Sequence, residues 1–322
     1  MHFSGKLSAA AAGTFRLGDR TVNRLGFGAM RLSGTGGMGR GTDRDPEQSA
    51  AVVRRAVELG VNHIDTAAFY FSASARANEV IRAALAPYPD DLAIVTKIGP
   101  GRDLATGEWG DWLRPDQLRA HVEHNLETLG MDRLPVVNYR SNGRDDVPAA
   151  VAALAGLRDA GLLDHIGLSN VGLDVLECAR RVAPIVCVQN RHAPGYERSD
   201  TGEVLGRCAE LGIAFVPFFA VAGRSRENTA EEEYDAVRQI AHAHGVTPAQ
   251  VRIAWNLALG PHALAIPGTG DLAHLEQNVA AASLRLTEGE LAALSTLAGQ
   301  ESPPMGRAPG HRPRRRESPP ST

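Results

Sequence analysis

The stretch from Gly60 to Tyr70 reads G-V-N-H-I-D-T-A-A-F-Y, and the interpretation of the whole chain starts from it. Its pattern predicts that a helix ends at Gly60 and that a short apolar strand runs from Val61 to Ile64. Asp65 follows where this strand should meet solvent. A carboxylate there is stable only if it sits at the strand end in contact with water or is paired with a cation.

A second apolar strand, A-I-V-T-K, ends at Lys97. Tyr70 lies in the loop after the first strand, five residues beyond Asp65. A carboxylate, a phenol and an amine near successive strand ends form a set of groups that can transfer a proton. An ion pair at the strand ends beside a packing tyrosine is the alternative that these residues alone leave open.

The rest of the chain alternates short apolar strands with amphipathic helical patterns. The strands recur near residues 25, 62, 93, 135, 164, 186, 214 and 263. Eight strands with helices between them predict an α/β fold, a (β/α)8 TIM barrel forming a single domain over residues 1–300. Function in such barrels lies at the C-terminal ends of the strands, so Asp65, Tyr70 and Lys97 should meet at one mouth.

A glycine-rich loop offers a different interpretation. Gly34, Gly36 and Gly39 spell G-x-G-x-x-G, the dinucleotide fingerprint of an open Rossmann sheet. That motif requires a helix that starts among the glycines. Here the helix start is better placed at Asp45 as N-cap with Pro46 in the first turn. We therefore interpret Gly34–Gly41 as a mobile loop over the mouth of the barrel.

The stretch from Gly60 to Tyr70, followed by V-T-K-I-G, resembles the signature of the aldo-keto reductase family. Further matches follow in the family's order, at H-I-G-L-S-N, V-Q-N and I-P-G-T-G…H-L-E-Q-N, so that the resemblance covers residues 20–297. The resemblance implies a barrel whose lower end is plugged by an N-terminal β-hairpin, here T-F-R-L-G-D-R-T-V from Thr14 to Val22. It also implies reduction of a small-molecule aldehyde or ketone to an alcohol, or the reverse reaction, by direct hydride transfer with a nicotinamide cofactor.

Hydride reduction of a carbonyl places negative charge on oxygen, and a proton must meet that charge. A free phenol donates poorly at neutral pH, but a neighbouring ammonium stabilises the phenolate and makes donation easier. A buried lysine in turn loses its proton unless an anion holds it. Our hypothesis makes Tyr70 the proton donor, Lys97 the group that tunes it and Asp65 the anchor of Lys97.

The fourth strand departs from the family pattern. Most members end it with a histidine that orients the carbonyl, whereas this chain reads P-V-V-N-Y-R-S-N-G, with Arg140 at that position. A subgroup with V-V-N-x-R is the closer match. Asn138 faces the same way as Arg140 by strand alternation. Arg140 is a permanent cation that suits the carbonyl oxygen or a substrate carboxylate but cannot act as an acid; a structural ion pair is the alternative.

The resemblance assigns the nicotinamide end of the cofactor to polar residues at three strand ends. Ser169, Asn170 and Gln189 would hydrogen-bond the carboxamide, to which short neutral polar groups are suited. Phe218, in F-V-P-F-F-A-V-A-G, would stack on the nicotinamide ring. Apolar periodicity alone would equally make Phe218 a core residue.

The last motif should hold the adenosine phosphate. The family places a lysine, a serine and an arginine here, whereas this chain has Gly268, Thr269 and His274, with Gln277 and Asn278 closing the motif. Backbone N–H groups at a helix N-terminus still favour an anion, but both strong cations are replaced. The resemblance implies NADPH, NADH remains the alternative, and Arg224 or Arg226 is a candidate for the missing charge.

Composition excludes several other classes. The formal net charge is −3, and because the last 22 residues are Arg-rich, the body of the chain is acidic, which argues against nucleic-acid binding. Three cysteines without a C-x-x-C pair suit a reducing cytoplasm. No apolar run is long enough for a membrane span. Residues 301–322 are rich in proline and arginine and should be disordered, and the oligomeric state is not determined by the sequence.

Two other functions compete with carbonyl reduction. The arginine at the histidine position suits a nucleotide-binding sensor or regulatory subunit with little catalysis, although the intact Asp65, Tyr70 and Lys97 favour an enzyme. A cofactor-free lyase or epimerase using Tyr70 and Lys97 would bind no nucleotide. No metal is expected, because the histidine pairs on predicted helices (His121 with His124, His242 with His244) have no third ligand.

Overall fold

The structure is a computed structural model that describes residues 7–34, 42–195, 201–218, 221 and 233–299. The expected disorder of residues 301–322 and nearly all of the loop Gly34–Gly41 lie outside the described residues, as do Arg224 and Arg226. No helix in the described part of the chain is both long and apolar enough to cross a membrane. The single-domain boundary at residue 300 stays a prediction.

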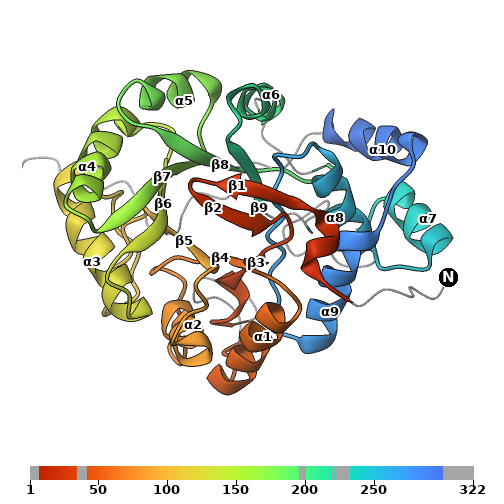
Figure 1. Ribbon diagram of the computed structural model, residues 1–322, viewed down its shortest axis with the longest axis horizontal. Helices are drawn as coiled ribbons and strands as arrows, with labels where there is room; N and C mark the ends of the chain where they lie inside the picture. The colour runs from red at the N-terminus through yellow and green to blue at the C-terminus, as the bar shows by residue number, and fades with distance from the viewer. Residues whose placement is uncertain (1–6, 35–41, 196–200, 219–220, 222–232, 300–322) are drawn as a thin grey trace, which may run out of the picture.

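Parallel strands form the centre of the molecule and neighbour one another in sequence order (Figure 1). They are β3 (Phe27–Gly28), β4 (His63–Asp65), β5 (Ala93–Ile98), β6 (Leu134–Arg140), β7 (Leu163–Ser169), β8 (Ile185–Arg191) and β9 (Ala214–Phe218). The register places Asp65 opposite Val95 and Lys97 opposite Asn138. Consecutive parallel order is the arrangement that a βα repeat predicts.

The segment around residue 263 closes this sheet into a barrel without forming a regular strand. Ala263 bridges Phe215 of β9, and Ala265 bridges Leu25 just before β3, both in parallel. The eighth strand was therefore predicted at the right place, but it is reduced to two bridges. The carbonyl of Pro267 still accepts a hydrogen bond of 3.2 Å from the amide of Gly28, but proline has no N–H with which to return one.

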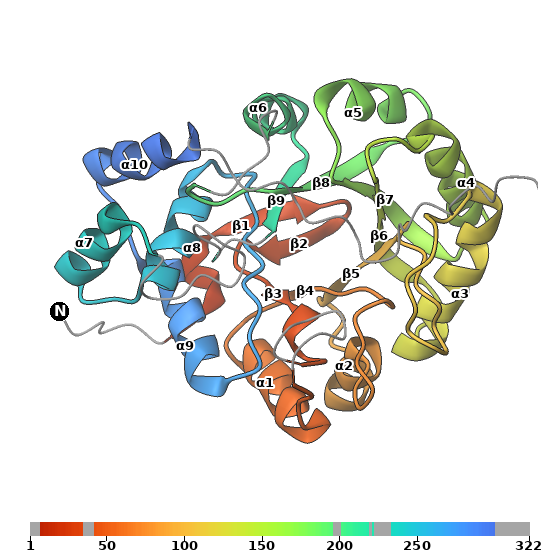
Figure 2. The same ribbon diagram turned by 180° about the vertical axis from the view of Figure 1, so that it is seen from behind.

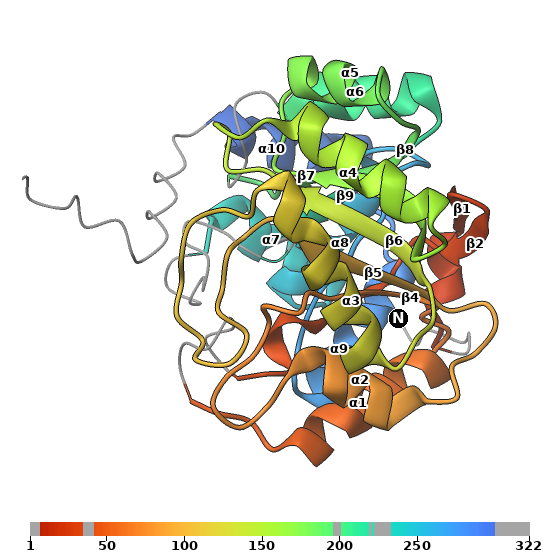
Figure 3. The same ribbon diagram turned by 90° about the vertical axis from the view of Figure 1, so that its left-hand side faces the viewer.

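Ten helices of the described chain lie around the barrel or beside it, and Figures 2 and 3 show them from behind and from the side. They are α1 (Pro46–Glu58), α2 (Ala77–Leu85), α3 (Leu118–Leu129), α4 (Val147–Asp159), α5 (Leu173–Arg180), α6 (Thr201–Leu211), α7 (Asp235–His244), α8 (Pro248–Ala258), α9 (Leu272–Ala280) and α10 (Glu288–Ser295). Short 3-10 turns are η1 (Ala9–Ala12), η2 (Ala29–Arg31), η3 (Pro115–Gln117), η4 (Ala281–Ser283) and η5 (Thr296–Gly299). The main apolar core lies between these helices and the outer face of the strands.

The N-terminal hairpin plugs one end of the barrel. Strands β1 (Thr14–Leu17) and β2 (Arg20–Asn23) pair antiparallel and lie in front of the barrel strands in Figure 1. Leu17 and Val22 are buried in the cluster that fills the interior, against residues such as Ala93 and Ala214 at the start of their strands. The hairpin therefore covers the N-terminal ends of the strands and leaves the C-terminal ends for function.

The start of α1 decides against the Rossmann interpretation. Asp45 is the N-cap, its carboxylate accepts a hydrogen bond of 2.9 Å from the amide of Glu47, and Pro46 occupies the first turn. The helix thus begins well after Gly39, so its N-terminus is not formed by the glycines. The barrel topology and this cap both agree with the prediction from sequence.

Candidate active site

Asp65 and Lys97 form a buried ion pair between neighbouring strands. Lys97 Nζ lies 2.6 Å from Asp65 Oδ2 and donates a second hydrogen bond of 2.9 Å to the carbonyl of Thr66. Only 2% of the lysine side chain and 7% of the aspartate side chain are exposed. Each charge compensates the other, and removing either partner would leave an uncompensated charge in the interior at large cost. The structure brings together the two charged residues that the sequence analysis selected.

Gln189, from the far side of the barrel, completes the shell of Asp65. Its Nε2 donates a hydrogen bond of 2.7 Å to Asp65 Oδ1, and its side chain is almost fully buried. The two carboxylate oxygens are thus divided between Lys97 and Gln189. The sequence analysis chose Gln189 for the cofactor only and missed its contact with the aspartate.

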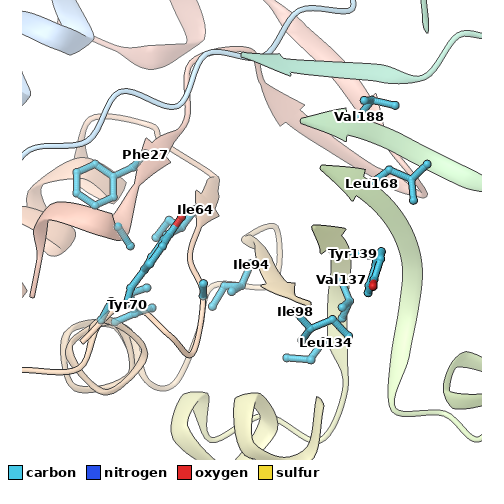
Figure 4. Close-up of a cluster of buried hydrophobic side chains, with 14 of the residues drawn as sticks. Phe27, Ile64, Tyr70, Ile94, Ile98, Leu134, Val137, Tyr139, Leu168 and Val188 are labelled. Carbon is cyan, nitrogen blue, oxygen red and sulfur yellow. The ribbon is translucent and has the colours of Figure 1, made fainter. Parts of the chain in front are cut away.

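Tyr70 lies in the loop after β4 with its ring beside Lys97. Lys97 Nζ is 4.9 Å from the centroid of the tyrosine ring, and Tyr70 is 7% exposed. Figure 4 places Tyr70 on the side of the core that also holds Phe27 and Ile64. No hydrogen bond between the Tyr70 hydroxyl and Lys97 is found among the described residues, so the ammonium meets the tyrosine through the ring face.

Asn138 and Arg140 come from β6, next to Lys97. Asn138 is fully buried, and its Oδ1 accepts a hydrogen bond of 3.1 Å from the thiol of Cys187. Burial raises the pKa of the Cys187 thiol, which keeps it a donor. Arg140 is partly exposed at the strand end, and its guanidinium carbon lies 5.1 Å from the centroid of the Phe218 ring. A cation over that aromatic face is favourable.

The residues chosen for the nicotinamide end lie on neighbouring strands. Ser169 ends β7, where it pairs with Arg140 of β6 on one side and with Gln189 of β8 on the other. Asn170 has a positive φ of 63°, and its side chain donates to the carbonyl of Ser141 at 2.9 Å. Phe218 ends β9 and is 8% exposed. The structure thus brings these residues together at neighbouring strand ends, and their roles toward a cofactor stay predictions.

Three buried polar atoms at this mouth have no hydrogen-bond partner among the described residues. They are Ser169 Oγ, Gln189 Oε1 and Asn138 Nδ2, on consecutive strands β7, β8 and β6. Buried polar groups are almost always paired in folded proteins, so three unpaired ones gathered at one place mark this mouth as a candidate ligand site. Donors and acceptors of this kind match a neutral carboxamide.

The predicted phosphate loop, which includes residues 268–270, precedes α9 and lies against Gly28 of β3. Gly28 and Gly268 approach so closely that a Cβ on Gly268 would lie 2.4 Å from the carbonyl oxygen of Gly28. Asp271 caps α9 by accepting a hydrogen bond of 2.8 Å from the amide of His274, and this contact lowers the pKa of its carboxyl. Thr269 is largely buried and its hydroxyl accepts from the amide of Asp271 at 3.1 Å.

The remaining residues of the motif differ in exposure. Asn278 is buried on α9, Gln277 is exposed, and the side chain of His274 is 68% exposed. The His274 ring is thus exposed, with its Nδ1 3.9 Å from Asp271 Oδ1, whereas Asn278 is buried.

Arg44 stands where the sequence analysis found a cation missing. Its Nη1 donates a hydrogen bond of 2.7 Å to the carbonyl of Gly270, and a Cβ on Gly270 would lie 2.3 Å from its Nε. Arg44 belongs to the loop after β3, far away in sequence. The signal that would have found it is barrel closure itself, which sets the loop after the first strand beside the loop after the last.

Metal ligands do not gather in the described part of the chain: no three His, Cys, Asp or Glu side chains come together there. His121 and His124 lie on α3, and burial lowers the pKa of both. The expectation that no metal takes part stays a prediction.

Comparison with known proteins agrees with this geometry. The sequence model of the Aldo/keto reductase family matches residues 24–298. Pyridoxine 4-dehydrogenase of Escherichia coli (strain K12) is 42% identical over 294 residues, which cover 88% of this chain and 98% of that protein. An uncharacterised oxidoreductase of Schizosaccharomyces pombe is 33% identical over 90% of this chain and 92% of its own length.

Solved structures show the same fold. The crystal structure of a thermostable aldo-keto reductase in complex with the inhibitor epalrestat has a TM-score of 0.74 and 28% identity, covering 88% of this chain and 99% of that one. An aldo/keto reductase from Klebsiella pneumoniae in complex with NADP and acetate has a TM-score of 0.72 at 24% identity, covering 90% and 96%. The chain is an oxidoreductase and belongs to the Aldo/keto reductase family.

Proposed function

We propose that this protein reduces an aldehyde to an alcohol with NADPH, that Tyr70 donates the proton, and that pyridoxal is its substrate. The observation that carries the chemistry is the buried Lys97–Asp65 pair, with the ammonium 4.9 Å from the centre of the Tyr70 ring. The substrate is suggested by the relative named pyridoxine 4-dehydrogenase, which this chain matches over 98% of its length. The aldehyde of pyridoxal is the oxidised form of the 4-hydroxymethyl group of pyridoxine.

Each residue has a distinct task in this proposal. Bound NADPH supplies the hydride to the carbonyl carbon. The Tyr70 hydroxyl gives its proton to the carbonyl oxygen, and the nearby Lys97 ammonium stabilises the phenolate that remains. Asp65 keeps Lys97 protonated, and the amide of Gln189 holds the other oxygen of Asp65 in place.

The nicotinamide end of the cofactor fits the polar atoms at the mouth. Ser169, Gln189 and Asn138 each keep one unpaired buried polar atom there, and a carboxamide would provide both donors and acceptors for them. Asn170 and Phe218 would complete this end of the site, the latter by covering the ring. The relevant fit is chemical: a neutral amide meets neutral polar groups rather than charges.

The choice of NADPH over NADH rests on Arg44. Its guanidinium lies against Gly270, in the loop where the family places its phosphate-binding cations. The amides of Gly268 to Gly270 precede α9 and favour an anion, while the ionised Asp271 opposes one. A fixed cation from a second loop offsets that carboxylate, which favours a 2′-phosphate.

Arg140 gives a physical reason for preferring pyridoxal over simple aldehydes. Pyridoxal carries an ionisable hydroxyl directly beside its aldehyde, so an anionic oxygen stands next to the carbonyl. A permanent cation with several donors in one plane can meet both oxygens. Arg140 lies at the end of β6, with its guanidinium carbon 5.1 Å from the Phe218 ring and in register with Ser169, and thus near the expected nicotinamide end of the cofactor, where the carbonyl has to lie.

The test compares pyridoxal with pyridine-4-carboxaldehyde, which has the same aldehyde but no neighbouring hydroxyl. The wild-type protein should oxidise NADPH with both and show the higher kcat/KM with pyridoxal. Arg140→Leu should remove this preference while leaving the affinity for NADPH unchanged.

Two results would contradict the proposal in different ways. A protein that binds NADPH but reduces no aldehyde of a broad panel would instead be the nucleotide-binding sensor considered above. If the wild type reduced both aldehydes with equal kcat/KM, pyridoxal would be contradicted as the preferred substrate, while the proposal of carbonyl reduction would stand.

A further inference from the structure

The loop between β5 and η3, residues 99–114, is stabilised by its own hydrogen bonds. Arg102 and Trp109 form an antiparallel bridge, and the amide of Asp103 donates to the carbonyl of Glu108 at 2.8 Å. The carboxylate of Asp103 accepts from two amides in the turn, and these contacts lower its pKa. The loop is therefore a small hairpin that holds Arg102 in a defined position.

The side chain of Arg102 joins this hairpin to the segment that contains Tyr70. Its Nη1 donates hydrogen bonds to the carbonyls of Phe69 (2.8 Å) and Phe71 (2.9 Å). Its Nε donates to the carbonyl of Gly107 within the hairpin at 3.0 Å. The two accepting carbonyls belong to the residues directly before and after Tyr70, so one guanidinium fixes the backbone on both sides of the tyrosine.

Aromatic contacts reinforce the same connection. The guanidinium carbon of Arg102 lies 3.6 Å from the ring centroid of Phe71 and 5.2 Å from that of Trp109. The ring of Phe69 meets Tyr70 edge-on at 5.1 Å and Trp109 at 6.2 Å. Each of these rings is thus in contact with Arg102 or with a residue whose carbonyl Arg102 holds.

The chemistry of this contact requires an arginine. Arg102 is 6% exposed, and among the described residues it has no carboxylate partner. Burial, and secondarily the charge of Arg76, lowers its pKa. A planar guanidinium can serve three carbonyls and lie flat on an aromatic ring at once, whereas an ammonium cannot stack in that way.

We propose that Arg102 is a positioning residue for Tyr70, which holds the phenol in its place beside Lys97 by fixing the peptide groups on either side of it. This inference rests on the proposed function, in which Tyr70 is the proton donor. The direction of the tyrosine side chain follows the orientation of these peptides. A displacement of about 1 Å in a reacting group is enough to slow a reaction by roughly a hundredfold.

Arg76 provides a matched control within the same structure. Its guanidinium carbon also lies against the Phe71 ring, at 4.4 Å, and its Nη2 donates to the carbonyl of Leu104 in the same hairpin at 2.8 Å. Arg76 thus joins the same two loops by the same kinds of contact. It makes no hydrogen bond to Phe69 or to the carbonyl of Phe71.

The experiment compares Arg102→Lys, Arg102→Met, Arg76→Lys and Tyr70→Phe with the wild type. The NADPH dissociation constant of each variant is measured by fluorescence titration. Its kcat and KM are measured by steady-state kinetics with pyridoxal, or with the aldehyde that the wild type reduces best. Arg102→Lys, which keeps the charge and should fold, is expected to lose at least about tenfold in kcat. Its NADPH Kd and aldehyde KM should stay within about twofold of wild type, and Arg76→Lys should keep a near-normal kcat.

The outcomes separate this inference from the proposed function. Equal kcat values for Arg102→Lys and Arg76→Lys would overturn the inference alone. So would a parallel loss of NADPH affinity and kcat in the Arg102 variants, because that would show general damage to the site. An inactive wild type, or a Tyr70→Phe variant of normal rate, would overturn the proposed function and the inference with it.

Discussion

The amide of Gln189 lies 2.7 Å from the carboxylate of Asp65, across the barrel from the strand that carries the aspartate. One residue thereby connects the expected nicotinamide end of the site to the ion pair that we propose tunes Tyr70. Replacement of Gln189 by Glu places a second carboxylate against Asp65 in a buried site, where both cannot stay ionised without large cost. We expect kcat to fall and NADPH to bind more weakly, both by at least about tenfold.

Gln117→Glu is the control for this change. It introduces the same charge at a capping residue of η3, outside the barrel mouth. Steady-state rates and fluorescence titration should give wild-type values for it. If Gln189→Glu also gives wild-type values, the contact with Asp65 contributes neither to kcat nor to NADPH affinity.

The buried ion pair makes a prediction about stability. Lys97→Met leaves Asp65 with an uncompensated charge in the interior, which typically costs about 3–5 kcal/mol. The double variant Lys97→Met, Asp65→Leu removes both charges and should be more stable than Lys97→Met alone. Urea unfolding at neutral pH measures both, and a double variant less stable than the single one would show that the pair matters for reasons other than charge burial.

Arg44 makes a prediction about cofactor choice. Arg44→Ala removes the cation beside Gly270 and with it a charge-assisted contact to a 2′-phosphate. The dissociation constant for NADPH should rise about ten- to a hundredfold while that for NADH changes little. Arg54→Ala, which removes an exposed ion pair with Glu47, serves as control. An equal loss for both nucleotides would contradict a phosphate contact.

His63 makes a prediction about pH. It is buried in β4, and burial lowers its pKa to about 4, with a smaller opposing effect from the backbone of Asn23. Because the pKa is lower in the folded than in the unfolded state, the unfolded chain binds more protons as pH falls from 6.5 towards 4. The free energy of unfolding should therefore be highest above pH 6.5 and fall below it, by up to about 3 kcal/mol from this residue.

His63→Asn tests that dependence. Urea unfolding at neutral and mildly acidic pH should show a smaller loss for this variant than for the wild type. The absolute stability of the variant decides nothing, since it lacks the packing of the imidazole. An unchanged loss would assign the acid sensitivity to other groups.

The sequence predicted the barrel because strand spacing, helix caps and the strand-end residues all pointed to one arrangement. Asp65 and Lys97 could be paired in advance, since adjacent parallel strands bring their ends together. The position of the eighth strand could be predicted but its length could not, because two isolated bridges and a regular ladder have the same apolar pattern in sequence. The hairpin plug followed from the family resemblance, and the burial of Leu17 and Val22 explains it.

Other contacts could not be read from sequence. The bond between Gln189 and Asp65 depends on the stagger of strands across the barrel, including the register shift between Ile166 and Leu168. Arg44 reaches Gly270 only because the barrel closes. The contacts of Arg102 depend on the shape of a loop whose turns place its side chain against the carbonyls of Phe69 and Phe71.

The most direct test is single-turnover oxidation of bound NADPH by pyridoxal in the Tyr70→Phe variant. That change removes one hydroxyl and keeps the ring beside Lys97. The account predicts a rate at least about a hundredfold below wild type with an unchanged NADPH dissociation constant. A variant that turns over at the wild-type rate would show that the proton comes from another group.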